Sequence, residues 1–332
     1  MKIEILDKAA VAAAGLDVPD IYYLPQYGST AELIDGGQWE CAVAEGGTFF
    51  FPYIRRSIPI ATGEWDLVSP YGYGGPISRE DGGLARFRRA FLDDARNRGC
   101  VAEFLRTNPL DFAERDMSAL HVARWRPHAT FAVNVVDGVE AYWEHCAGRH
   151  RTAVRKSVKS GVSVREVAAY ALLDSDSAFR QLYRDTMDRV GATARLKLTD
   201  EYFEALVSGL SDHVSVIEAA TSDKVLAAAV FMRWGRRIHY HLSGSSPDGM
   251  RLGATNAVLD YAVRELLPAD GVLHLGGGVS GGDGLETFKR SIANRQLSVF
   301  LCSTVVDEGR YDELVREFDA DPDSSYFPAY RA

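Results

Sequence analysis

The segment from Gly271 to Ala293, GVLHLGGGVSGGDGLETFKRSIA, constrains the fold of this chain more than any other. Its apolar run from Val272 to Leu275 predicts a short buried strand, and helical spacing resumes at Leu285. The glycines in between allow positive φ angles and the close approach of a ligand. We predict a strand-turn-helix unit in which Lys289 and Phe288 lie beside an opening lined by Gly277 and Gly278. A purely structural turn is the alternative.

The chain is long enough for two domains. Its 332 residues exceed the size at which a single hydrophobic core usually stops growing. Both halves run from hairpin-like strands through a helix to a further strand, which predicts two related α/β units. We place the boundary so that the domains span residues 1–134 and 135–332.

The composition limits the possible partners. A formal net charge of -9 argues against a surface that binds nucleic acid or anionic membrane as a whole, so any such contact must be local. The four cysteines lack CxxC spacing, and we therefore expect no metal site and reduced thiols. No segment has the features of a signal peptide or a membrane span, so we expect a soluble, cytoplasmic protein.

Two candidate substrate-binding regions stand in the first half. The loop DLVSPYGYGGP sets Tyr71 and Tyr73 among glycines and prolines, where the rings either form a ligand wall or fold back over a core edge. A strand from Val101 to Leu105 is followed by Arg106 and Asn108, which we include as candidates.

A basic segment opens the second half. Within AYWEHCAGRHRTAVRKSVKSGV, helical spacing places Arg151, Arg155 and Lys159 in one stripe with Lys156 beside it, and directs Val154 and Val158 to the core. No acid occurs between Glu144 and Glu166. This stripe is either a binding surface for phosphate or RNA backbone, or an ordinary solvated helix face.

Three successive antiparallel strands are predicted at 214–219, 225–232 and 237–243. Alternation in the third strand places His239 and His241 on one face, with Ile238, Tyr240 and Leu242 on the other. The two imidazoles either project into a cleft or form the polar surface of the sheet.

The order of these elements resembles an acyl-CoA N-acyltransferase (GNAT) core. The pieces SPYGYGGP, RHRTAVRKSVKSGV, LGATN and HLGGG followed by Phe288-Lys289 resemble, in order and spacing, the Fem family of aminoacyl-tRNA-dependent peptidyltransferases. This resemblance spans most of the chain. It implies an α/β fold of two tandem GNAT-like domains with mixed, largely antiparallel sheets flanked by helices.

The resemblance also implies a reaction. An amino acid would move from a tRNA ester to a peptide amine, with charged tRNA as co-substrate and with no CoA, metal or ATP. The first domain would serve the acceptor, and the second would hold the aminoacyl-tRNA and the reacting pocket. Lys289 would lie near the ester and Phe288 would line the pocket. A fixed ammonium and glycine N–H groups can stabilise the oxyanion that forms.

Two departures from the family shape this interpretation. Some members carry an aspartate before proline where this chain has Asn108, and an amide cannot accept the proton. Either the acceptor amine arrives neutral, or the donor amine or a ribose hydroxyl assists, or His239 or His241 substitutes. No room exists for the long coiled-coil arm, which makes this a compact version. Compact members of the pacidamycin type act in antibiotic assembly, and we therefore expect an antibiotic-peptide acceptor, carrier-protein-tethered or free, or else a cell-wall precursor. Alanine or glycine is the expected donor residue.

Two alternatives remain open. The first is an acyl-CoA-dependent N-acyltransferase, although Arg251-Leu252-Gly253-Ala254 is too short for the usual pyrophosphate loop. The second is a non-catalytic scaffold whose tandem domains bind RNA or a carrier protein.

Overall fold

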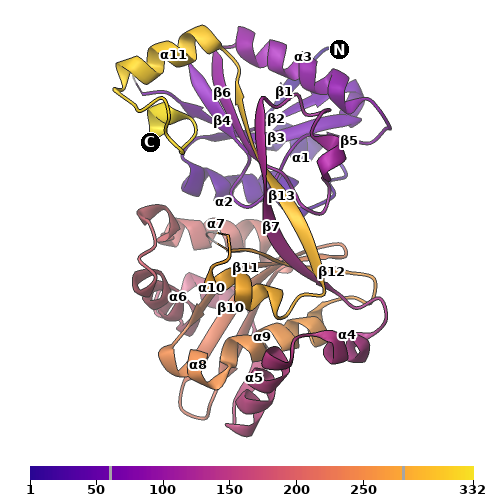
Figure 1. Cartoon of the computed structure of the whole chain (residues 1–332), viewed down its shortest axis with the longest axis vertical. Coiled ribbons are helices and arrows are strands. Elements are labelled where there is room, and N and C mark those ends of the chain that lie inside the picture. The colour runs from indigo at the N-terminus through magenta and orange to yellow at the C-terminus, as the bar shows by residue number, and fades with distance from the viewer. Residues whose placement is uncertain (60–61, 279–280) are drawn as a thin grey trace. The chain divides into compact units, whose positions relative to one another are not determined.

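The computed structural model describes residues 1–59, 62–278 and 281–332 of an α/β protein with mixed β-sheet flanked by helices (Figure 1). The chain forms two compact units. The first contains residues 1–18, 22–128 and 298–332, and the second contains residues 19–21 and 129–297. The domain boundary at residue 134 stays a prediction, and the compact units depart from it because the C-terminal residues cluster with the first unit.

The first unit is built on a mixed sheet of order β1-β2-β3-β4-β6-β13, in which only the β4–β6 pair is parallel among the pairings of its described residues. The short strand β5 pairs with β3. A turn at Glu45–Gly47 joins β2 to β3, and Gly46 adopts the left-handed conformation there at φ 65°. The strands are β1 (Glu4–Leu6), β2 (Gln38–Ala44), β3 (Phe49–Ser57), β4 (Trp65–Val68), β5 (Ile77–Ser78), β6 (Cys100–Arg106) and β13 (Arg295–Val305).

The helices of the first unit are α1 (Lys8–Ala14), α2 (Pro25–Asp35), α3 (Leu84–Asn97) and α11 (Glu308–Glu317). The amphipathic helix α3 buries Phe87 and Phe91 in an aromatic core. Arg88 on the same helix is fully buried and forms an ion pair with the fully buried Glu103 of β6. This pair fixes α3 to the sheet.

The second unit has a mixed sheet of order β7-β12-β11-β10-β9-β8. The three predicted antiparallel strands are confirmed as β9, β10 and β11, and the β11–β12 pair is parallel. Parallel register sets His239 beside His274. The strands are β7 (Arg124–Asn134), β8 (Ser163–Val167), β9 (Val214–Ala220), β10 (Val225–Trp234), β11 (Arg237–Ser245) and β12 (Val272–Gly277). The first residues of β7, up to position 128, belong to the first unit.

Helices of the second unit cover an aliphatic and aromatic core. Among the residues that the structure describes, no helix is both long and apolar enough to cross a membrane. The helices are α4 (Val139–His145), α5 (Gly148–Lys159), α6 (Ala178–Arg189), α7 (Asp200–Leu210), α8 (Pro247–Leu252), α9 (Ala254–Tyr261) and α10 (Gly284–Arg290), with a π-helical turn at Ala262–Leu266.

Helix α5 corrects one packing prediction. Val154 is buried as expected, but Val158 is 67% exposed, so its predicted place in the core is wrong. The buried face of α5 instead contains His150, Val154 and Ser157. Because His150 and Ser157 share the inner face with Val154, the buried face of the helix differs from the predicted one.

Candidate functional site

The strand-turn-helix unit places Lys289 where the sequence predicts it. Strand β12 ends at Gly277, and α10 begins after Asp283, whose carboxylate accepts from the N–H of Glu286 at 2.7 Å. The Nζ of Lys289 donates to the carbonyl oxygen of Gly277 at 2.8 Å. The lysine side chain thus folds back from the helix onto the end of the strand.

Lys289 is an unusual lysine because it is only 9% exposed. Burial lowers its pKa from 10.5 to about 8, although Asp283 acts in the opposite direction. The ammonium also lies 5.9 Å from the ring centroid of Tyr240. A buried amino group whose pKa lies near neutrality is a common property of reacting sites.

The glycines of the turn have different structural roles. Gly276 has a positive φ of 76° and so bends the end of β12. A Cβ atom on Gly278 would lie 2.5 Å from the carboxylate of Asp283, so a side chain there would displace the helix cap. Phe288 is half-buried and packs against the core of the second unit. Val279 and Ser280 of the predicted turn lie outside the described residues.

A buried polar cluster lies on β11 and β12 of the same unit. Nε2 of His239 is 2.8 and 3.0 Å from the two carboxylate oxygens of Asp20, and its Nδ1 is 3.4 Å from Nδ1 of His274. Arg237 contacts Asp20 at 3.2 Å. Burial and the neighbouring His239 and Lys289 lower the pKa of His274 well below its usual value.

Sequence reasoning identified only His239 of this cluster. His274 could have been found, since it alternates with the core residues Leu273 and Leu275 and therefore faces the same side as His239. Asp20 precedes His239 by 219 residues, and no local pattern indicates that contact.

His241 lies on the same strand face but makes a different contact. Ile238 is in the core and Tyr240 packs against it, so the histidines occupy the other face as alternation predicts. Nε2 of His241 is 2.6 Å from the hydroxyl of Tyr202. Burial and His239 lower the pKa of His241 to about 3, which keeps this imidazole neutral at physiological pH.

The first-unit candidates lie together at the end of β6. The loop residue Gly74 exchanges backbone hydrogen bonds with Arg106 and Asn108, each at 2.8 Å. The guanidinium of Arg106 lies 5.8 Å from the ring centroid of Tyr71, and Tyr73 packs edge-on against Tyr22 at 5.5 Å. The aromatic loop is therefore fixed to the strand and half-buried.

Asn108 has a structural function in this loop. It is fully buried, and its side-chain oxygen accepts from the N–H of Leu110 at 3.0 Å. Its carbonyl accepts from the N–H groups of Asp111 and Phe112. The amide thus closes the turn that follows β6.

The predicted phosphate-binding residues on α5 fall into two groups. Nη1 of Arg151 lies 2.6 to 3.1 Å from the carbonyls of Trp143, Glu144 and Cys146 and caps the end of α4. Lys156 donates to the carbonyl of Arg251 at 2.7 Å, and Arg155 lies over the ring of Trp143. Arg155, Lys156 and Lys159 are exposed. The outward-facing charge therefore comes from these three residues more than from Arg151.

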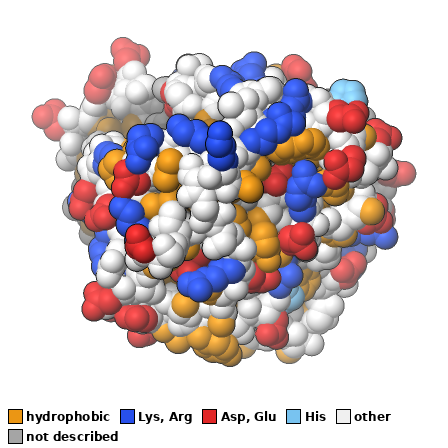
Figure 2. Space-filling model, turned by 90° about the horizontal axis from the view of Figure 1, so that it is seen from below, with side chains coloured by type: hydrophobic (Ala, Val, Ile, Leu, Met, Phe, Trp, Pro, Cys, Tyr) orange, Lys and Arg blue, Asp and Glu red, His pale blue; other side chains and the backbone are white. Residues whose placement is uncertain are grey.

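Figure 2 views the molecule from the end where α5 and α8 lie in Figure 1. Lys and Arg side chains gather on one part of this face, among hydrophobic side chains. At its first turn, α5 also reaches the helix that carries Lys289, because Arg149 donates to the carbonyl of Thr287. The basic helix and the Lys289 turn are thus joined by a hydrogen bond within one unit.

Comparison with known proteins agrees with the geometry. Residues 148–290 match the model of the acetyltransferase (GNAT) domain family. No curated protein matches the chain. The family match includes α5, the three antiparallel strands and the Lys289 turn.

Several solved structures share this fold over most of the chain. The crystal structure of FemX aligns with a TM-score of 0.69 at 12% identity, covering 94% of this chain and 99% of FemX. The C-terminal domain of a putative lysylphosphatidylglycerol synthetase from Agrobacterium fabrum aligns at 0.57 and 16% identity, covering 85% and 88%. A tandem GNAT protein from the clavulanic acid biosynthesis pathway aligns at 0.50 and 11%, covering 92% and 99%. The chain therefore has a FemX-like tandem GNAT fold.

Proposed function

We propose that this protein transfers an amino acid, alanine or glycine, from a tRNA ester to the amine of a peptide. The observation that carries the proposal is the buried Lys289, held by Gly277 at the end of β12. The Fem resemblance implies that this lysine lies near the reacting ester. The similarity to FemX supports the fold in which this chemistry would occur.

The reaction needs a group that stabilises developing negative charge. A neutral acceptor amine attacks the ester carbonyl, an amide bond forms, the ester C–O bond breaks, and the amine proton passes to the departing ribose oxygen. The carbonyl oxygen becomes an oxyanion during this sequence. The ammonium of Lys289 would stabilise that charge, and the low polarity around it would strengthen the interaction.

Direct proton removal by a histidine is disfavoured. His239 is only 1% exposed and its Nε2 is bound by Asp20, so its imidazole is not available to a substrate in this conformation. His241 has a pKa of about 3 and is a weak base. Asn108 closes the turn after β6, and its amide cannot accept a proton. We therefore propose that the acceptor enters as a neutral amine and that the substrates themselves relay the proton.

The exposed residues of α5 are the proposed contact with tRNA phosphates. Reversing two of them, Arg155→Glu with Lys159→Glu, should weaken transfer and reduce its dependence on salt, by about one unit of log–log slope for each phosphate that is no longer neutralised. Arg236→Glu is a matched control, because this exposed arginine of the same unit lies outside α5. An unchanged salt dependence in the double variant would exclude α5 from tRNA binding.

The deciding experiment supplies individually charged tRNAs and several acceptors, and identifies products by mass. Antibiotic-type peptides, carrier-tethered peptides and peptidoglycan precursors are the main acceptors. Phosphatidylglycerol vesicles form another arm because one similar structure is the C-terminal domain of a putative lysylphosphatidylglycerol synthetase. A product heavier by one alanyl or glycyl group supports the proposal. No aminoacylated product from any combination would reject it.

A second candidate function is acyl-CoA-dependent N-acylation, and the match of residues 148–290 to the acetyltransferase domain favours it. Gly253, with a φ of 77°, alone separates the short helix α8 from α9, so the connection before α9 offers few free N–H groups to a pyrophosphate. Calorimetric titration with acetyl-CoA separates the two: micromolar binding favours acylation. A non-catalytic scaffold would show no transfer with either donor.

A further inference from the structure

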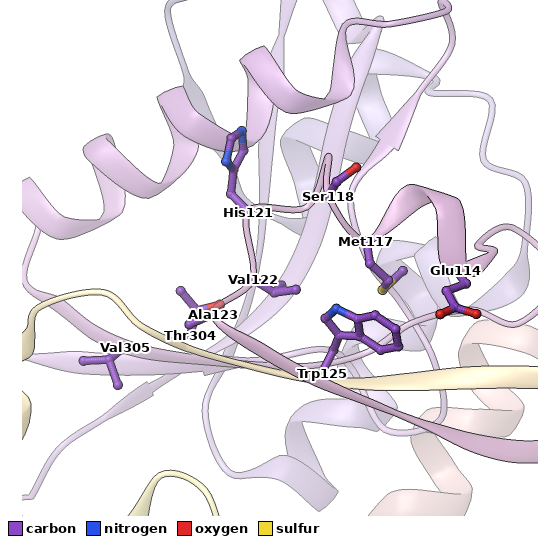
Figure 3. Close-up of a pocket in the computed structure, with 9 residues that line it drawn as sticks. All are labelled: Glu114, Met117, Ser118, His121, Val122, Ala123, Trp125, Thr304 and Val305. Atoms are coloured by element: carbon purple, nitrogen blue, oxygen red, sulfur yellow. The ribbon is translucent and has the colours of Figure 1, made fainter.

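A hollow lies in the first unit, and none of its described lining residues is among those discussed for transfer. Its volume is about 870 Å³, and it is bounded by the segment that follows β6 and by the end of β13. Figure 3 shows Trp125, Met117 and Glu114 close together at one side of the hollow, with Thr304 and Val305 toward the other. The hollow has the size of a small-molecule site.

The walls of the hollow are held in place by hydrogen bonds to the neighbouring helix. Nε of Arg88 donates to the carbonyl of Leu120 at 3.0 Å, and Nε2 of His121 contacts the carbonyl of Ala85 at 3.1 Å. Both bonds fix the segment to α3. Trp125 packs edge-on against Phe300 at 5.5 Å, which sets the orientation of its ring. The hollow is therefore a formed feature of the unit.

Thr304 gives the first indication of a ligand. Its side chain is only 7% exposed, and its Oγ1 has no hydrogen-bond partner among the described residues. A buried hydroxyl without a partner is unfavourable by about 1 to 3 kcal/mol. Because Thr304 lines the hollow, a polar group of a bound molecule can satisfy this hydroxyl.

The end of the hollow opposite Thr304 favours a positively charged group on the ligand. The indole of Trp125 is 39% exposed, and the carboxylate of Glu114 lies on the same side of the hollow (Figure 3). Among the lining residues whose side chains the structure describes, none is a lysine or an arginine. An aromatic face beside a carboxylate attracts an ammonium group and disfavours anions.

We propose that this hollow binds a small primary amine with an apolar body. The ammonium would lie between Glu114 and the Trp125 ring, the apolar part would contact Met117 and Val122, and a polar group of longer ligands would reach Thr304. This site is independent of the proposed transfer reaction, and its test needs no catalytic activity.

The test compares three probes of similar shape and different charge by calorimetry on the full chain: phenethylamine, 2-phenylethanol and 3-phenylpropionate. We expect saturable binding of the amine, about tenfold tighter than that of the carboxylate, with the alcohol between them. Equal binding of the three probes, or no saturable binding of the amine, would overturn the proposal.

Variants locate the site. Glu114→Gln should remove the preference for the amine over the alcohol, whereas the exposed Glu308→Gln should leave it unchanged. Trp125→Ala should weaken amine binding about fivefold or more. Trp125→Phe controls for poor packing of the Ala variant, because it keeps an aromatic ring and should bind the amine more tightly than Trp125→Ala. Amine binding that is insensitive to both Glu114 and Trp125 places the ligand elsewhere and contradicts the inference.

Discussion

Each unit buries a positively charged side chain, but the two cations have different surroundings. In the first unit the guanidinium of Arg88 faces the carboxylate of Glu103 and also donates to a backbone carbonyl, and both side chains are fully buried. In the second unit the ammonium of Lys289 donates to the neutral carbonyl of Gly277. Arg88 is compensated by an opposite charge in direct contact, whereas Lys289 is bonded to a dipole.

This difference separates a structural cation from a candidate catalytic one. A buried charge with a bonded counter-charge has no spare interaction to give to a substrate, and its removal leaves the partner unpaired. A buried ammonium on a neutral acceptor retains its electrostatic field for an incoming negative charge. We therefore expect substitution of Arg88 to lower stability and substitution of Lys289 to lower activity.

The largest expected effect is on stability, from Arg88→Met. Removing the guanidinium leaves Glu103 buried without its charged partner, which should lower the free energy of unfolding by about 3 to 5 kcal/mol. Urea unfolding followed by circular dichroism measures this loss. The double variant Arg88→Met with Glu103→Leu is the control, because it removes both charges and should recover much of the stability. A single variant as stable as the wild type would contradict the structural role of the pair.

Lys289→Met should produce the opposite result. Transfer should fall by about 10²- to 10³-fold, the usual effect of losing one oxyanion-stabilising group, and the fold should be retained. Single-turnover transfer with a charged tRNA measures the rate. Arg290→Met is the matched control, since the neighbouring arginine is exposed and forms an ion pair with Glu286 along the helix. Equal rates for wild type and Lys289→Met would remove Lys289 from the reaction.

The parts that the sequence predicted are those encoded by local periodicity. The strand before Gly276, the helix that carries Lys289 and the three antiparallel strands follow from apolar spacing and turn residues. Lys289 could be proposed as a site residue because strand, glycines and lysine are close together in the chain. The tandem GNAT-like fold was expected from the order of these elements together with the resemblance of several sequence pieces to the Fem family.

The remaining features depend on contacts between distant residues. Asp20 reaches His239 across 219 positions, and the hollow in the first unit combines the segment around Trp125 with Thr304. Charge spacing on α5 correctly indicated a helix, but it could not show that Arg151 caps α4. Nor could it show that His150 and Ser157 replace Val158 on the buried face.

Asp20→Asn examines whether the second unit also contains a structural charged cluster near Lys289. Asparagine keeps the shape of the side chain but loses the charge that binds His239 and Arg237, which should lower the free energy of unfolding by about 2 kcal/mol. Thermal unfolding and the transfer rate should be measured together. We expect a stability loss with a modest change in rate. A loss of rate as large as that of Lys289→Met, with stability unchanged, would instead make Asp20 part of the reacting site.

The smallest expected effect is the pH dependence of stability caused by Lys289. Its pKa is about 8 in the folded protein and 10.5 is its ordinary value, so between these values the unfolded chain binds more protons than the native one. The contribution of Lys289 to stability should therefore rise with pH in this window, by about 1 to 2 kcal/mol from pH 8 to 9.5. Lys289→Met lacks this titration, so the stability of the wild type relative to the variant should increase over the same range. Chemical unfolding of both proteins at each pH measures the difference and cancels the other titrating groups. A constant difference would mean that the ammonium is compensated in the native state as fully as Arg88, and the contrast between the two buried cations would then disappear.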